Sequence, residues 1–234
     1  MKRTTFEDLE KEFNINKDIV HDIRTMATAV QANIDDGPWI AGGSILRALI
    51  GFDLKEHLGT YAKLFPGVEL YLRSYDIDIW FKDLDQYQYY QEKFSPELKS
   101  PKKIEVTVND KDESIDENND IPKDIFVSSF ETDLITNKKI QLIKYKDLDS
   151  GIQLIREFDF TCVQLFTDGK TVVTFEETLD DIRNRILRMN RFRHQPNMLN
   201  RSIKYISLGF IPDLETSYII NQMATNLKDI ECFY

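Results

Sequence analysis

The sequence predicts an α+β fold in which a small mixed β-sheet with flanking helices is followed by a helical C-terminal segment. Apolar residues recur at three- and four-residue steps through the first thirty residues, which is typical of an amphipathic helix. Residues 75–81 alternate polar and apolar side chains with a period of two, which indicates a half-buried strand. Helical spacing returns after Thr178. With 234 residues, the chain is long enough to bury a core.

The first thirty residues are predicted to be helical, with Thr4 or Thr5 as the N-cap. Gly37-Pro38 interrupts this pattern, and residues 39–41 form a short apolar run that predicts a buried strand. A tight turn at Gly42-Gly43 follows. We predict that Ser44 then caps a helix over residues 45–50, which ends at Gly51.

Later elements are predicted from the same two periodicities and from turn residues between them. Residues 126–132 and 139–145 flank a loop and predict an antiparallel hairpin. The remaining expectations are a helix over 54–64 with a turn at 66–67, a helix over 87–94, an exposed loop over 109–120, strands over 158–166 and 170–175 separated by Asp168-Gly169, and helices over 179–187 and 198–209.

Composition is that of a globular protein, with 41% hydrophobic and 30% charged residues. Two cysteines are too few for a disulfide framework, and no run approaches the length needed to cross a bilayer, so we expect a cytoplasmic protein with no membrane partner. The net charge of −10 argues against a general nucleic-acid binder. Seven Lys or Arg residues and no acid lie within 182–212, however, so one end is locally basic or carries a solvated helix face.

The chemistry is predicted to lie at Asp76 and Asp78. Because these residues are two apart on one predicted strand, both carboxylates project to the same side. Paired carboxylates can hold Mg²⁺ or Mn²⁺ against substrate phosphates. The alternative is a strand with an alternating polar face and no catalytic role.

Gly42, Gly43 and Ser44 precede this strand and connect a predicted strand to a predicted helix. Glycines allow backbone N–H groups to approach phosphate oxygens, and a helix N-terminus adds partial positive charge. Alone the motif is an ordinary turn. Its position in the chain, ahead of the strand with the two aspartates, favours phosphoryl transfer from a nucleoside triphosphate.

These motifs resemble the DNA polymerase β nucleotidyltransferase superfamily, which has a Gly-Gly-Ser/Thr turn followed by an Asp-x-Asp strand. Residues 42–51 are similar in length and apolar pattern to the Gly-Gly-x-Val-Arg-Asp-x-Leu-Leu-Gly element of bacterial-type (class II) CCA-adding enzymes and poly(A) polymerases. Residues 158–161 resemble that group's Arg-Asp-Phe-Thr segment, and residues 179–188 and 196–210 resemble its neck. The resemblance covers roughly residues 37–210, in order.

The resemblance implies a nucleotidyltransferase head over residues 1–175 and a helical neck over 176–234, without the body and tail domains. It implies metal ligation by Asp76 and Asp78. Other site residues are predicted at the turn and in the neck, where the alternative is ordinary surface cations. The nucleotide-binding candidates are Gly42, Gly43, Ser44, Arg47, Arg188, Arg201, Lys204 and Tyr205, the last by stacking on a base.

Several departures limit what the resemblance carries over. Leu46-Arg47 stands where the group has Arg-Asp, and residues 194–198 replace the Glu-Asp-x-x-Arg element that reads the base, so CCA specificity is not predicted. Gln141 falls where many members have a third carboxylate. Asp159 is the leading substitute as a catalytic residue, and its alternative role is a structural link between head and neck.

The predicted function is therefore metal-dependent transfer of a nucleoside monophosphate, such as AMP from ATP, to a hydroxyl acceptor with release of pyrophosphate. An RNA 3′ end, including that of tRNA, is the favoured acceptor. A protein side chain is the alternative within enzymes. A third possibility is an inactive nucleotide-binding or interaction module of the same fold, which the glutamine at position 141 keeps open.

Overall fold

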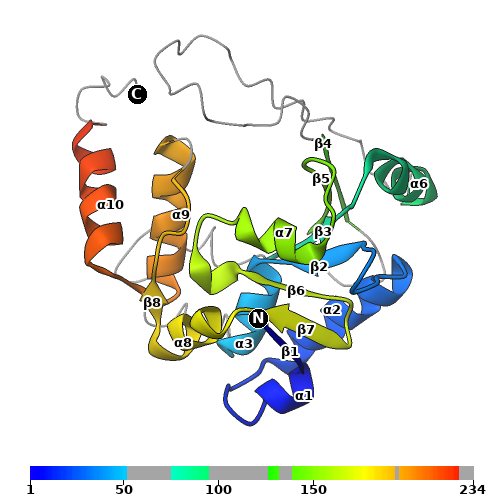
Figure 1. The fold of residues 1–234 in the computed structure, drawn as a ribbon, viewed down its shortest axis with the longest axis horizontal. Coiled ribbons are helices and arrows are strands. Elements are labelled where there is room, and N and C mark those ends of the chain that lie inside the picture. Colours follow the sequence, from blue (N-terminus) through cyan, green and yellow to red (C-terminus); the bar gives the residue numbers. More distant parts are fainter. Residues whose placement is uncertain (52–74, 95–125, 132–138, 193–194, 227–234) are drawn as a thin grey trace.

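A computed structural model describes residues 1–51, 75–94, 126–131, 139–192 and 195–226. Its centre is a seven-stranded sheet with the order β1-β7-β6-β2-β3-β5-β4 (Figure 1). Strands β3 and β5 pair in parallel and all other neighbours in this sheet are antiparallel, so the predicted mixed sheet is confirmed. The strands are β1 (Lys2–Thr5), β2 (Trp39–Ala41), β3 (Asp76–Trp80), β4 (Phe126–Glu131), β5 (Lys139–Lys144), β6 (Leu165–Thr167) and β7 (Thr171–Thr174).

The N-terminal segment differs from the predicted continuous helix. Residues Lys2–Thr5 form β1, which pairs along β7 at the edge of the sheet. Two helices follow, α1 (Phe6–Leu9) and α2 (Lys17–Ala29), and Thr5 caps the first of them, as one of the two predicted caps. The strand was missed because Lys-Arg-Thr-Thr has no apolar alternation, and its pairing depends on β7, which is distant in sequence.

The centre of the molecule confirms the predicted strand-turn-helix unit. Strand β2 is fully buried between β3 and β6, and helix α3 (Gly43–Leu49) begins directly after it. This helix packs against α2 and β3. The predicted cap is wrong, because Gly42 occupies the N-cap position and Ser44 lies inside the first turn. Gly51 ends the helix with a φ of 62°, which glycine adopts without strain.

The second half carries the predicted hairpin, since β4 and β5 are antiparallel. Helix α6 (Leu84–Phe94) and helix α7 (Gly151–Arg156) flank the sheet, and α7 packs against β6 and β7. Residues 158–166 are not one strand as predicted. Thr161–Val163 form a 3₁₀ turn, η2, because their backbone N–H groups bond locally or to Arg188, and β6 begins only at Leu165.

The C-terminal part is mainly helical, as predicted, but the helix predicted over 179–187 ends at Asn184, because Ile186–Leu187 pair with Ile211–Pro212 as a short strand. Helix α9 (Gln195–Ser207) and helix α10 (Leu214–Asn226) lie side by side beyond one end of the sheet (Figure 1). They are connected to the sheet through α8 (Glu176–Asn184) and a small parallel pair, β8 (Ile186–Leu187) with β9 (Ile211–Pro212). Arg185 joins this part to α3 by donating to the carbonyl oxygens of Leu208 and Ile50, at 3.2 and 3.3 Å.

The expected helix over 54–64, its turn at 66–67 and the expected loop over 109–120 lie outside the described residues. Within the described part of the chain, none of the helices combines the length and apolar character needed to cross a bilayer.

Candidate active site

Asp76 and Asp78 lie on one side of β3, as the sequence predicts. The strand alternates strictly, with Ile77 and Ile79 fully buried and both aspartates partly exposed. Burial raises the pKa of Asp78 to about 7, and the negative charge of Asp76 adds to this increase. The two carboxylates therefore lie close enough to repel each other, which favours binding of a cation between them.

The glycine turn lies beside this strand through an aromatic contact. Gly42 has a φ of 86° and donates its N–H to the carbonyl oxygen of Leu165 on β6 at 3.0 Å. The Phe158 ring packs against Gly42 and also contacts Trp80, with its centroid 5.5 Å from the indole. Strand pairing and this aromatic contact thus fix the position of the turn beside β3.

Ser44 is almost completely buried, and its Oγ has no hydrogen-bond partner among the residues that the structure describes. A buried hydroxyl without a partner is destabilising, so an unpartnered donor beside the turn is suited to an incoming oxygen. A Cβ added at Gly43 would have no described atom within 4 Å, which leaves open space above the first residue of α3.

Positive charge reaches the aspartates from three elements. Lys204 and Arg201 on α9 and Lys139 on β5 all act to lower the pKa of Asp78. Arg47 on α3 is only 2% exposed, and its burial lowers its pKa while Tyr205 and Asp76 raise it. Lys204 has its pKa lowered by burial and by the charge of Arg47, and raised by Asp78. These interactions gather Arg47, Arg201, Lys204 and Lys139 around the two carboxylates.

The predicted third carboxylate, Asp159, is buried and forms an ion pair with Arg201 at 2.7 Å. Its backbone carbonyl oxygen accepts the N–H groups of Asn190 and Arg191, at 2.6 and 3.2 Å. These contacts join the segment before η2 to α9 and to the chain after β8. The geometry therefore matches the structural alternative for Asp159, and direct metal ligation stays a prediction.

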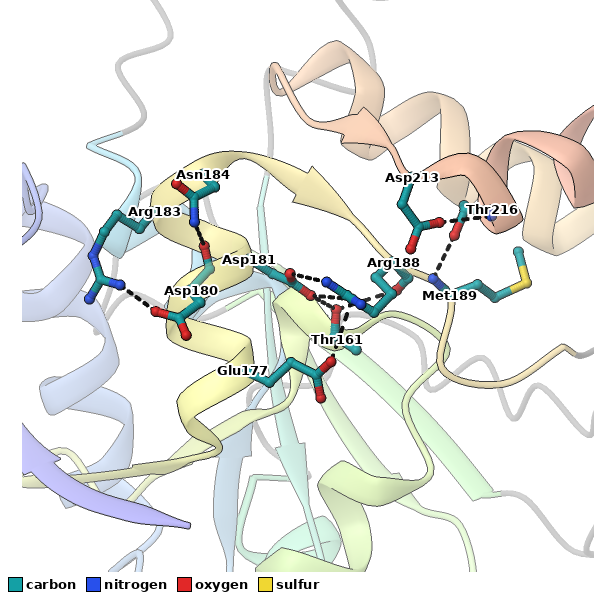
Figure 2. A network of polar contacts seen from close by, with 10 residues as sticks. All are labelled: Thr161, Glu177, Asp180, Asp181, Arg183, Asn184, Arg188, Met189, Asp213 and Thr216. Carbon is teal, nitrogen blue, oxygen red and sulfur yellow. Dashed lines mark hydrogen bonds and ion pairs between the residues drawn. The ribbon is translucent and has the colours of Figure 1, made fainter.

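Arg188 does not point at the aspartates of β3. Its guanidinium bonds both carboxylate oxygens of Asp181, at 3.1 and 3.2 Å, and lies 3.5 Å from Glu177. Figure 2 shows this network, in which Thr161 also donates to Asp181. Asp181 is 1% exposed and thus depends on these partners. The structure gives Arg188 a structural partner in place of the predicted nucleotide.

Tyr205 also departs from its predicted role. Its ring is 3% exposed and packs edge-on against Phe160, with centroids 5.2 Å apart. A nucleobase needs an open ring face to stack, so base stacking on Tyr205 does not fit this burial. The contact instead anchors α9 on the segment that carries Asp159.

Lys139 and the bonds made by Gln141 were not anticipated from sequence. Strand β5 pairs in parallel with β3 so that Gln141 lies opposite Asp78 and Lys139 lies opposite Asp76. Lys139 and Gln141 are two residues apart on one strand, so their side chains lie on the same side of the sheet. This spacing is the signal in the sequence that could have identified them. Among the described residues, no group of three or more His, Cys, Asp or Glu side chains forms a metal-binding cluster.

The sheet order, the turn and the Asp-x-Asp strand together define a nucleotidyltransferase-like fold. The structure is similar to the Thermotoga maritima CCA-adding enzyme complexed with tRNA-CCA over 97% of this chain and 47% of that chain, at a TM-score of 0.52 and 14% identity. A CCA-adding enzyme in complex with ATP is similar over 97% of this chain and 46% of the other, at a TM-score of 0.52 and 13% identity. The complex of a CCA-adding enzyme with CTP has a TM-score of 0.51 at 13% identity over 97% of this chain and 47% of the other.

The chain thus spans about half the length of these structural neighbours. At such low identity, the structural similarity shows a shared fold and nothing more. By sequence, residues 10–185 match the Gabija anti-defense 2 (Gad2) family, and the chain belongs to that family. No functionally curated protein matches the sequence.

Proposed function

We propose that this protein is a metal-dependent nucleotidyltransferase whose site is formed by Asp76, Asp78 and the turn at Gly42–Ser44. The observation that carries the proposal is the projection of two partly exposed carboxylates from one side of β3, beside a glycine turn and within electrostatic reach of the cations of α9. The acceptor hydroxyl oxygen bonds to the α-phosphorus, the bond from that phosphorus to the pyrophosphate oxygen breaks, and the hydroxyl proton is released.

The two carboxylates fit a magnesium or manganese ion. Mg²⁺ is commonly held by one or two carboxylates together with substrate phosphates, which is the donor set that Asp76 and Asp78 offer. Burial and then the negative charge of Asp76 raise the pKa of Asp78, and a bound cation would offset both effects. When bound, the ion would neutralise charge on the transferring phosphoryl group and lower the pKa of the attacking hydroxyl.

The cations of the site have a separate task in this proposal. A nucleoside triphosphate and the departing pyrophosphate carry several negative charges, which Lys204 and Arg201 can offset from α9. Arg47 contributes positive charge from a buried position on α3, where it interacts electrostatically with Asp76. Gly43 has no Cβ, and the space beside it is open. Phosphate oxygens can therefore approach the backbone N–H groups of Gly43 and Ser44.

The acceptor has two candidates. An RNA 3′ end is supported by the likeness of fold to CCA-adding enzymes, one of which is described in complex with tRNA. A protein side chain is the second candidate, and the family name, Gabija anti-defense 2, motivates it. Transfer of a nucleotide onto a protein of the Gabija defence is a direct way for such an enzyme to act.

The test compares Asp76→Asn/Asp78→Asn with wild type in the presence of Mg²⁺ or Mn²⁺ and each labelled nucleoside triphosphate. Total RNA and total protein are offered as separate acceptors, and pyrophosphate release is followed in parallel. We expect wild type to label one acceptor pool and the variant to fall to background while it still unfolds in one cooperative thermal transition.

Asp35→Asn/Asp36→Asn is the matched control, because it removes two exposed carboxylates whose ion pairs with Arg3 and Lys82 contribute little. The control should label its acceptor as wild type does. Labelling that persists in Asp76→Asn/Asp78→Asn would overturn the proposal. Nucleotide binding by wild type without pyrophosphate release would instead identify a binding module.

A further inference from the structure

Gln141 is bonded to one of the proposed metal ligands. When the amide is oriented so that both neighbours are satisfied, its side-chain nitrogen donates to Oδ1 of Asp78 at 3.0 Å, and its side-chain oxygen accepts from Nζ of Lys139 at 2.8 Å. Because Gln141 and Asp78 are register partners on β5 and β3, the bond spans two adjacent strands of the sheet.

An amide at this point differs from a carboxylate in two ways. It is uncharged, so it adds no negative charge to Asp76 and Asp78. It also presents an N–H to Asp78, whereas an ionised carboxylate could only accept and would repel that oxygen. The bond holds Oδ1 of Asp78 and leaves the second oxygen of that carboxylate available to a cation.

Charge around the pair works in the same direction. Lys139, Arg201 and Lys204 all act on Asp78 from β5 and α9. Two carboxylates facing these cations and Arg47, of which Arg201 is also paired with Asp159, attract a divalent ion weakly, since affinity for such ions follows the charge and number of the oxygen ligands. Mg²⁺ sheds its water reluctantly and takes six oxygens, so most of its ligands at this site must come from elsewhere.

A nucleoside triphosphate supplies what is missing, because its phosphate oxygens bring both ligands and negative charge. We propose that Gln141 is a positioning residue that holds Asp78, and that this two-carboxylate site takes up its divalent cation together with the triphosphate and not before it. This inference rests on the proposed function. It states the order in which the divalent cation and the triphosphate bind at the proposed site.

The experiment titrates Mn²⁺ by calorimetry onto wild type, Gln141→Glu and Gln141→Leu without nucleotide. Gln88→Glu is the matched control, since it makes the same charge change on an exposed face of α6. We expect weak Mn²⁺ binding to wild type and to the control, and at least about tenfold tighter binding to Gln141→Glu, which supplies a third carboxylate. Tight binding of Mn²⁺ alone to wild type would overturn the inference.

A second measurement follows retention of Mn²⁺ and of labelled α,β-methylene analogues of ATP and CTP in equilibrium dialysis. Wild type should retain metal and analogue in equal amounts, each requiring the other. Gln141→Leu should lose about tenfold in that joint affinity at an unchanged unfolding temperature, a loss that a merely structural role would not produce. Joint affinity equal to that of wild type in Gln141→Leu would contradict the positioning role.

The two proposals fail in distinguishable ways. If wild type retains neither analogue at any Mn²⁺ concentration and labels no acceptor, the proposed function itself fails. If wild type labels its acceptor but binds Mn²⁺ tightly before nucleotide, only the order of binding is overturned.

Discussion

Arg201 of α9 forms an ion pair of 2.7 Å with Asp159, whose side chain is only 5% exposed. The same arginine acts electrostatically on Asp78. The Arg201 side chain thus interacts both with the buried Asp159 before η2 and with Asp78, the proposed metal ligand. Loss of Arg201 leaves Asp159 as a buried charge without this partner.

Arg201→Met is therefore expected to lower the free energy of unfolding by about 1–3 kcal/mol, the cost of removing a partner from a buried charged group. Urea unfolding measures this change. Arg191→Met is the control, because Glu157, the partner of Arg191 at 2.5 Å, also pairs with Lys146 at 3.2 Å and therefore keeps a cation when Arg191 is lost. The double variant Asp159→Asn/Arg201→Met should recover part of the loss, and equal losses in Arg201→Met and Arg191→Met would contradict the role given to the pair.

The same pair tests the catalytic role that the sequence predicts for Asp159. A purely structural Asp159 predicts that Asp159→Asn lowers stability while the folded protein keeps its turnover. Direct participation predicts a loss of turnover at temperatures where the variant is fully folded. Because the carboxylate is engaged by Arg201, we expect the first result.

Gly43→Ala tests whether triphosphate approaches the turn, because it should alter that approach without disturbing the fold. Since a Cβ at Gly43 would have no described atom within 4 Å, the change in the free energy of unfolding should stay within about 1 kcal/mol. If triphosphate oxygens approach this backbone, the added methyl should raise the KM for nucleotide by roughly tenfold, equivalent to about 1.4 kcal/mol. Steady-state incorporation assays measure it.

Gly42→Ala provides the contrast, because a φ of 86° is strained for alanine and should cost about 1–2 kcal/mol of stability. An unchanged KM in Gly43→Ala would show that phosphate does not approach the turn at this residue.

Arg188 and Lys204 are both cations of the C-terminal part, but they interact with different acids, Arg188 with Asp181 and Lys204 with Asp78. Arg188→Ala removes two bonds from the buried carboxylate of Asp181 and should cost about 1–3 kcal/mol of stability, with the KM for nucleotide unchanged. Lys204→Ala should raise that KM with little loss of stability, because Lys204 acts on Asp78. Unfolding and kinetic measurements on both variants decide the matter, and a raised KM in Arg188→Ala would restore its predicted contact with nucleotide.

The contrast between these two residues shows what the sequence can predict. Asp76 and Asp78 share one side of a strand because side-chain alternation is local, so their geometry follows from their spacing. The turn at Gly42-Gly43 is local for the same reason. Tyr205 and Asp159 instead acquire their partners from distant segments of the chain, and Arg188 bonds Asp181 on the preceding helix. The residue types alone are equally consistent with a nucleotide site.

The errors in secondary structure have the same origin. Strand β1 exists because β7 pairs with it, and the 3₁₀ turn at Thr161–Val163 is stabilised by Arg188 from beyond α8. Neither partner is visible in the local pattern of apolar residues. The helical C-terminal part was predicted because its periodicity is local, as in α9, whose apolar face includes Met198 and Tyr205.

The raised pKa of Asp78 predicts how stability depends on pH in the metal-free protein. Burial, and then the charge of Asp76, raise this pKa from 3.8 to about 7. Between these values the folded protein keeps a proton that the unfolded chain has released, so the contribution of Asp78 to stability falls as the pH rises through that window. Asp78→Asn carries no such proton. In EDTA, the unfolding temperature of Asp78→Asn relative to wild type should therefore increase from pH 5 to pH 7 and level off between pH 7 and pH 8. A difference that stays constant across this range would mean that Asp78 ionises as an ordinary exposed carboxyl, and the electrostatic description of the site would then be wrong.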